Sequence, residues 1–273
     1  MNTPLRYAIC NETFDGWPRA KACDSAAAAG YTGLEVAPFT LAGLATEITT
    51  AQRGDTRRTI ACAGLDCVGL DWLLAKTEGF HVAHPEAAVR SRTVEYLGEL
   101  ARLCQDLGGC ALVFGAPKQR SLLPGVTAEQ SLDRIHELFS RLVPVLETTD
   151  TVVALEPLSA AETDVLTTGV ETWGLIERID SPRVRLQLDL KAMSSEAEPI
   201  SDVMLACARH REHFHANDPN LQGPGFGAVD FKALDEVRYA GWVSMEVFDY
   251  APGSERLARE SVDSTHRVGA ALG

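Results

Sequence analysis

The amino-acid sequence predicts an α/β protein that folds as a single (β/α)8 TIM barrel spanning residues 1–273. Three observations support this prediction. Eight short apolar segments recur along the chain, helix start and stop signals lie between them, and successive segments begin 28 to 45 residues apart. That spacing suits a strand, a loop and a crossover helix. A doubly wound sheet would need a glycine fingerprint after the first segment, and none occurs there.

The apolar segments are rich in Leu, Val and other large apolar residues, which is typical of strands buried on both faces of a parallel sheet. We expect strands at residues 5–10, 33–37, 65–70, 110–115, 151–156, 183–189, 212–216 and 242–247.

The intervening segments carry helix punctuation. Pro18 and Gly30 bracket the first of them, as a proline at the first helical position and a glycine just past the end. Thr127 and Gln130 form a capping box that opens the helix before the fifth strand. Pro144 is expected to end or kink that same helix.

Composition excludes several functions. The formal net charge is −13, which disfavours nucleic acid as a partner because phosphate backbones are repelled. There is no secretory signal pattern and no apolar run of the ~18 residues that a membrane span needs. The seven cysteines, without a CxxC pair, are expected to be reduced and mostly buried thiols. We therefore expect a cytoplasmic protein that binds neither nucleic acid nor membrane.

Four chemistry-bearing residues end the last four predicted strands. They are Glu156, Asp189, His215 and Glu246, separated by 33, 26 and 31 residues. The loops at this end of a (β/α)8 barrel form the active site, so we expect the four side chains to meet at one depth.

Three carboxylates that converge in an apolar barrel repel one another, and a bound dication relieves that repulsion. The set contains three carboxylates, one imidazole and no thiolate. It predicts Mn²⁺, Mg²⁺ or Co²⁺, with Mn²⁺ as our first expectation and Zn²⁺ as an open alternative.

Several motifs resemble one family. They are EPL at Glu156, the strand-end Asp189, the His213/His215 pair, the stretch GPGFGAVDF and the segment GWVSMEVF. With these motifs the chain resembles the xylose isomerase-like barrel superfamily, specifically the sugar (phosphate) isomerase/epimerase group that includes D-tagatose/D-psicose 3-epimerases, hydroxypyruvate isomerase and inosose dehydratase.

The resemblance implies roles for individual residues. It makes Glu156, Asp189, His215 and Glu246 the metal ligands, with the two glutamates also acting as the catalytic acid/base pair. It places Glu162 against the substrate, a sugar or sugar-like ketone, and it implies a homo-oligomer.

Two positions depart from the 3-epimerase pattern. Ala192 stands where those enzymes have a substrate-binding His, and Leu221 stands where they have an Arg. Both departures argue against a free ketohexose as the substrate and leave the metal ligands intact.

The predicted chemistry is proton abstraction next to a carbonyl group. A bound dication would stabilise the enediolate, while one glutamate takes the proton and the other returns it. The predicted activity is thus a metal-dependent sugar isomerase or epimerase. A lyase or dehydratase acting on a keto-sugar or cyclitol is the main alternative. A DNA-repair endonuclease and a non-catalytic sugar-binding barrel are two further ones.

Other residues have a functional and a structural interpretation. Lys118 and Arg120, on a mouth loop, could bind a substrate oxygen or be ordinary loop charges. Lys191 could replace the missing His or face solvent, and Trp72 could form a wall for a sugar ring or pack in the core. Gln187 could orient Asp189 or fill a polar layer inside the barrel.

Three residues of the first two predicted strands could also reach the cavity. They are Asn11, Glu12 and Glu35.

Overall fold

The computed structural model describes residues 5–209, 211–229 and 239–271, and its eight parallel strands close into a barrel in chain order. The strands are β1 (Arg6–Cys10), β2 (Gly33–Val36), β3 (Asp66–Leu70), β4 (Ala111–Phe114), β5 (Val152–Leu155), β6 (Val184–Asp189), β7 (Arg211–Ala216) and β8 (Trp242–Met245). Each overlaps a predicted segment. The (β/α)8 prediction is confirmed.

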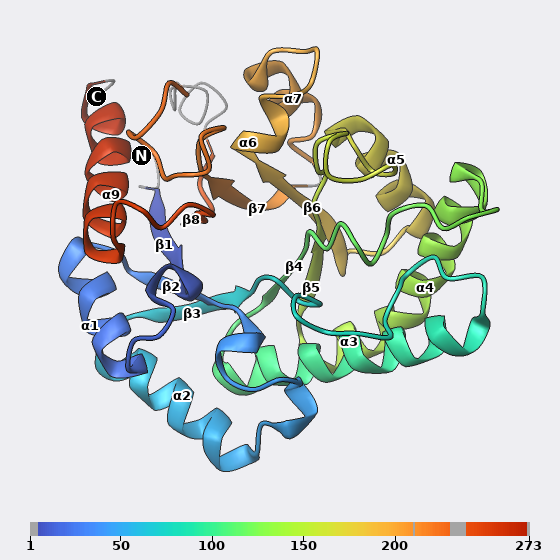
Figure 1. Cartoon of the computed structure of the whole chain (residues 1–273), viewed down its shortest axis with the longest axis horizontal. Helices are drawn as coiled ribbons and strands as arrows, with labels where there is room; N and C mark the ends of the chain where they lie inside the picture. The colour runs from blue at the N-terminus through green and yellow to red at the C-terminus, as the bar shows by residue number, and fades with distance from the viewer. Residues whose placement is uncertain (1–4, 210, 230–238, 272–273) are drawn as a thin grey trace.

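Helices surround the strands, as Figure 1 shows. They are α1 (Arg19–Ala29), α2 (Thr50–Cys62), α3 (Ala87–Leu107), α4 (Ala128–Thr149), α5 (Gly169–Ile179), α6 (Leu190–Met193), α7 (Ile200–Ala206) and α9 (Ser254–Ala271). Short 3₁₀ turns lie at η1 (Asn11–Phe14), η2 (Pro38–Thr40) and η3 (Ala45–Glu47). The buried strand residues and the inner helix faces form one apolar core.

The helix signals place most boundaries correctly. Gly30 ends α1 in the left-handed conformation, and the capping box at Thr127 opens α4. Pro18 is the N-cap of α1 rather than its first helical residue. Of the two outcomes predicted for Pro144, an end of the helix is wrong, because α4 continues through it, and a kink at this residue stays a prediction. The apolar face of α4 extends beyond Pro144 to the buried Leu146, and the free energy gained by burying this face outweighs the backbone hydrogen bond lost at Pro144.

Polar side chains line the inside of the barrel at successive depths along its axis. Strand pairing places Gln187 beside His213, and Asp189 beside His215 one level nearer the carboxyl ends of the strands. On the opposite side, Cys10 of β1 pairs with Glu35 of β2. Because side chains alternate along a strand, these residues share the inner surface of the barrel.

All seven cysteines are free thiols. Four of them are buried, whereas Cys62 and Cys110 are exposed. No helix in the described part of the chain combines the length and the apolar character needed to cross a bilayer.

Candidate metal centre and active site

The four predicted metal ligands lie together at the carboxyl-terminal end of the barrel. Asp189 and His215 lie at the ends of β6 and β7, and Glu156 and Glu246 directly follow β5 and β8. One ligand atom from each residue lies within 4.8 Å of those of the other three. All four side chains are buried. The structure therefore gathers the four residues around a common centre.

Hydrogen bonds fix the carboxylate of Asp189. Asn217 donates its Nδ2 to Asp189 Oδ2 at 2.6 Å, and the backbone N–H of Ala192 donates to Oδ1 at 2.7 Å. The second bond caps the short helix α6. Asn217 is fixed in turn, because its Oδ1 accepts from the backbone N–H of Lys191 at 2.9 Å. The carboxylate thus has one defined orientation.

His215 lies between two glutamates. Its Nδ1 is 3.0 Å from Glu246 Oε2, and its Nε2 is 3.1 Å from Glu35 Oε2. The same Glu35 oxygen lies 3.1 Å from His213 Nε2. A carboxylate on the far nitrogen of a metal-binding imidazole orients the ring and raises its basicity. Glu35 therefore turns Nδ1 of His215 toward the acidic cluster.

The pKa shifts show that the cluster carries more negative charge than its surroundings compensate. Burial, and then repulsion from Glu246, raise the pKa of Glu156 well above its ordinary value and that of Asp189 to about 6. Burial alone would lower the pKa of His215, but Glu246 and Glu35 hold it well above its ordinary value. Burial would raise the pKa of Glu35, and the two histidines beside it lower it.

Two residues position Glu156. Arg120 is fully buried and donates its Nη1 to the backbone carbonyl of Glu156 at 2.6 Å. Gly115 leaves room for the Glu156 side chain, because a Cβ there would lie 1.7 Å from its Oε2. Burial lowers the pKa of Arg120 to about 10, so its guanidinium stays charged near neutral pH.

The centre fits a divalent cation. No lysine or arginine within the described ranges forms an ion pair with Glu156, Asp189 or Glu246, and buried carboxylates need a counter-charge. Three carboxylates and one imidazole form a donor set that suits Mn²⁺, Mg²⁺ or Co²⁺. Glu156 and Glu246 also line an open cavity, which leaves space for a substrate beside the ion.

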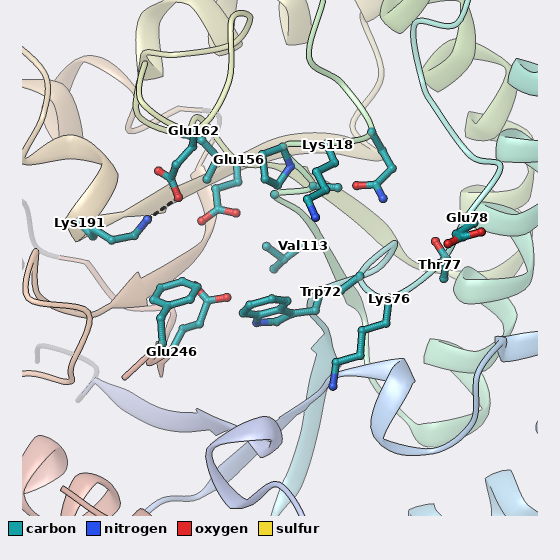
Figure 2. Close-up of a pocket in the computed structure, with 17 residues that line it drawn as sticks. Trp72, Lys76, Thr77, Glu78, Val113, Lys118, Glu156, Glu162, Lys191 and Glu246 are labelled. Carbon is teal, nitrogen blue, oxygen red and sulfur yellow. Dashed lines mark hydrogen bonds and ion pairs between the residues drawn. The ribbon is translucent and has the colours of Figure 1, made fainter. Parts of the chain in front are cut away.

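The cavity has a volume of about 720 Å³, within the range of small-molecule sites. Figure 2 shows Glu156 and Glu246 on opposite sides of one end, with Thr77 and Glu78 at the other. Trp72 and Lys118 line the stretch between them.

A family model described as xylose isomerase-like TIM barrel matches residues 23–267. The chain belongs to this family. It is 27% identical over 190 residues to a probable ketose 3-epimerase of Synechocystis sp. (62% of this chain and 66% of that protein). It is 30% identical over 171 residues to a 3-dehydro-D-guloside 4-epimerase of Escherichia coli (58% and 65%). The matches thus span about two thirds of each curated relative.

Solved structures show the same fold over almost the whole chain. A D-psicose 3-epimerase in the presence of D-fructose superposes with a TM-score of 0.83 at 18% identity, covering 97% of this chain and 99% of that one. A 3-keto-D-glucoside 4-epimerase of E. coli superposes with a TM-score of 0.82 at 17% identity, covering 97% and 100%. At these identities the likeness shows the fold alone.

In this family member, Lys191 occupies the mouth of the cavity. Its Nζ forms an ion pair with Glu162 Oε1 at 2.8 Å (Figure 2) and lies 4.9 Å from the ring centroid of Phe248. Its side chain is only 12% exposed, so the alternative that it faces solvent is wrong. Burial raises the pKa of Glu162, but the hydrogen bond from Lys191 outweighs it and lowers that pKa. The pair lies one residue from Ala192, where the 3-epimerase pattern has a His.

The remaining candidate residues divide between a place in the substrate cavity and a structural role. Trp72 and Lys118 line the cavity, whereas Arg120 is buried and binds backbone. Gln187 is buried and donates no hydrogen bond to Asp189, so the expectation that it orients this ligand is wrong.

The sequence analysis did not predict that Asn217 holds Asp189 or that Glu35 holds His215. Asn217 lies two residues after His215, a spacing that places both on one face of a strand and that could have indicated it. Glu35 approaches from β2, which is far from β7 in sequence, and no local signal connects them. Asp71, which follows β3 inside the barrel, was missed as well.

Proposed function

We propose that the protein is a divalent-metal-dependent epimerase of sugar-like ketones. The observation that carries this proposal is the placement of Glu156 and Glu246. Both belong to the four-residue cluster and both line the cavity, and they enter it from opposite sides (Figure 2). Two carboxylates on opposite sides of a substrate can remove a proton from one face and deliver one to the other, which is epimerisation.

A divalent ion held by Glu156, Asp189, His215 and Glu246 would supply Lewis-acid polarisation of the substrate oxygens; we expect Mn²⁺ in this position. The protein residues perform the proton transfers. Glu246, which lines the cavity, is placed to take the proton from the carbon beside the carbonyl. Glu156 is placed to return a proton from the other side. Acid/base steps of this kind typically contribute about 10²–10⁴-fold each.

The mouth of the cavity indicates the class of substrate. The 3-epimerase pattern binds sugar hydroxyls with a His and an Arg, and this chain has Ala192 and Leu221 there. Leu221 is 44% exposed. The Lys191–Glu162 pair instead offers an ammonium and a carboxylate to substrate hydroxyls. The cavity continues past Trp72 to Thr77 and Glu78, which supports a keto-sugar that carries a substituent, such as a 3-keto glycoside.

On such a substrate, elimination from the same enediolate is the competing outcome, and product analysis separates the two. Mn²⁺-loaded protein is incubated in deuterated water with ketohexoses, 3-keto glycosides and inososes, and NMR follows each C–H signal. The proposal predicts deuterium at the carbon beside the carbonyl and a product of unchanged composition. A released aglycone or water would make the enzyme a lyase, and no exchange on any compound would contradict proton abstraction.

The Glu246→Gln variant tests the assigned base. It should bind the substrate and lose exchange by about 10²–10⁴-fold, as expected for a lost acid/base group. Glu129→Gln, an exposed change in the first turn of α4 outside the cavity lining, is the matched control and should exchange at close to the wild-type rate.

A further inference from the structure

A second group of potential ligands lies beside the four-residue centre, at the carboxyl ends of β1 and β3. Cys10 ends β1, Glu12 lies in the adjoining turn η1, and Asp71 directly follows β3. A thiol sulfur and one oxygen from each carboxylate lie within 4.8 Å of one another. Cys10 and Asp71 stand at the carboxyl ends of β1 and β3, which flank β2 in the closed barrel, and Glu12 lies in the turn that follows β1, so their relative positions are set by the scaffold.

These two carboxylates are buried without compensation. Glu12 is 2% exposed and Asp71 is 0% exposed. Neither of them accepts a hydrogen bond from a nitrogen or oxygen donor anywhere in residues 5–209, 211–229 and 239–271. A buried carboxylate with no partner is costly, and it is neutralised either by a proton or by a cation.

Glu35, another buried carboxylate inside the barrel, has hydrogen-bond partners that compensate its charge. Glu35 lies on β2, between β1 and β3, and is 0% exposed. Its Oε2 is 3.1 Å from an imidazole nitrogen of His213 and of His215. Within the described part of the chain, no imidazole nitrogen lies within hydrogen-bond distance of Glu12 or Asp71.

A shared proton does not account for the pair. Two carboxylic acids that shared a proton would hydrogen bond to each other, and Glu12 and Asp71 form no such bond. Burial, and then repulsion from neighbouring carboxylates, raise the pKa of both groups well above ordinary values. Among the described residues, the negative charge around the pair therefore outweighs the positive charge, to which His215 contributes.

We propose that Cys10, Glu12 and Asp71 form a second divalent-cation site, of the kind that binds Zn²⁺, beside the four-residue centre. One sulfur and two carboxylate oxygens form a three-ligand set that Zn²⁺ accepts, and a fourth position stays open. The two sites adjoin, because His215 Nε2 and Cys10 Sγ both lie close to the same Glu35 oxygen, at 3.1 and 3.5 Å. The harder donor set at Asp189 and the thiol-containing set at Cys10 would thus prefer different ions.

Cobalt is the probe that tests the site without reference to activity. Full-length protein is freed of metal with a chelator and titrated with Co²⁺, and the bound equivalents are counted after gel filtration. The proposal predicts two equivalents per chain and a near-ultraviolet absorption band from charge transfer between Cys10 sulfur and cobalt. A single equivalent without that band would overturn it.

Variants assign each equivalent. Cys10→Ser should remove the band, and Glu12→Gln/Asp71→Asn should bind one equivalent fewer than the wild type. Cys104→Ala, another buried thiol far from these ligands in the sequence, is the matched control and should keep both. Asp189→Asn should lose the other equivalent and keep the band, which separates this proposal from the four-residue centre. A band that survives Cys10→Ser would contradict the proposal.

Failure to fold does not obscure the result. Each variant is checked by circular dichroism and by the rise in melting temperature that saturating Zn²⁺ causes. A folded Glu12→Gln/Asp71→Asn protein should show a smaller rise than the wild type. An equal rise, with the same number of bound equivalents, would mean that Glu12 and Asp71 are protonated and hold no metal.

Discussion

The two halves of the barrel mouth treat buried carboxylates differently. On the side of β6 and β7, Asp189 accepts two hydrogen bonds, and His215 is fixed between two glutamates. On the side of β1 and β3, Glu12 and Asp71 have no nitrogen or oxygen donor among the described residues. The ligands of the first half are already held in position, whereas the carboxylates of the second form no ion pair with any residue that the structure describes.

The difference shows what each half needs from an ion. Where outer partners orient the donors, an ion binds without reorganising the protein, and each outer partner contributes to affinity. Where the donors have no partners, a cation is itself the partner. Substitutions in the first half should therefore weaken metal binding, whereas substitutions in the second should remove its ion and also relieve repulsion between the buried carboxylates.

The largest effect is expected from Asp189→Asn. This change removes a ligand charge from the first half, and Mn²⁺ affinity should fall by more than the roughly 100-fold that loss of an outer partner causes. Isothermal titration calorimetry measures it. Asp66→Asn, at the exposed start of β3, is the control. Affinity unchanged in Asp189→Asn would remove this residue from the centre.

Gly115→Ala should have the next largest effect. The added methyl group would meet Glu156 Oε2 at 1.7 Å and displace that carboxylate. Mn²⁺ affinity should fall toward the upper end of the roughly 10–100-fold range for disturbed ligand support. Gly174→Ala is the matched control, since nothing lies within 4 Å of its Cβ. Equal affinities in the two variants would show that Glu156 does not bind the ion.

Glu35→Gln should weaken Mn²⁺ binding by about 10-fold. The neutral amide no longer supports a positive charge on His215, so the pKa of His215 should fall. NMR titration of the histidine ring protons in metal-free protein measures that shift. A His215 pKa that does not move would mean that Glu35 has no influence on the ligand it contacts.

The last prediction concerns stability and pH rather than metal affinity. The pKa of Asp189 is raised from 3.8 to about 6 in the folded, metal-free protein. The folded state thus binds more protons than the unfolded state in this window, so the free energy of unfolding should fall as pH rises from about 4 to about 6. For this one group the loss is of the order of 3 kcal/mol.

Urea denaturation at a series of pH values measures this slope, and Asp189→Asn should flatten it. Saturating Mn²⁺ should reverse the trend, because the ion competes with protons for the same oxygens. A metal-free wild-type protein that gains stability between pH 4 and pH 6 would contradict the assigned shift.

Much of the fold was predictable, because a strand buried on both faces is rich in apolar residues, and most strands of the barrel are, with β7 (Arg211–Ala216) the clearest exception. The ligands were predictable for a related reason. A carboxylate or imidazole that interrupts the apolar residues of such a strand at its carboxyl end must face the barrel mouth. Glu156, Asp189, His215 and Glu246 all stand at that point of their strands.

What the sequence did not reveal depends on contacts between distant strands. Glu35 reaches His215 across 180 residues, and the distance in sequence hides the pairing. In the sequence nothing distinguishes Lys191 from a surface lysine, whereas in the folded protein its Nζ lies 2.8 Å from Glu162 Oε1. Asp71 lies beside Cys10 and Glu12 only because the barrel closes, and the sequence contains no sign of this contact.

The most direct test is anomalous X-ray diffraction from crystals of the protein loaded with Mn²⁺, recorded on both sides of the manganese absorption edge. We predict a manganese peak enclosed by Glu156, Asp189, His215 and Glu246, with a ligand oxygen or nitrogen of each residue in contact with it. A fully loaded crystal with no manganese among these four side chains would contradict the account.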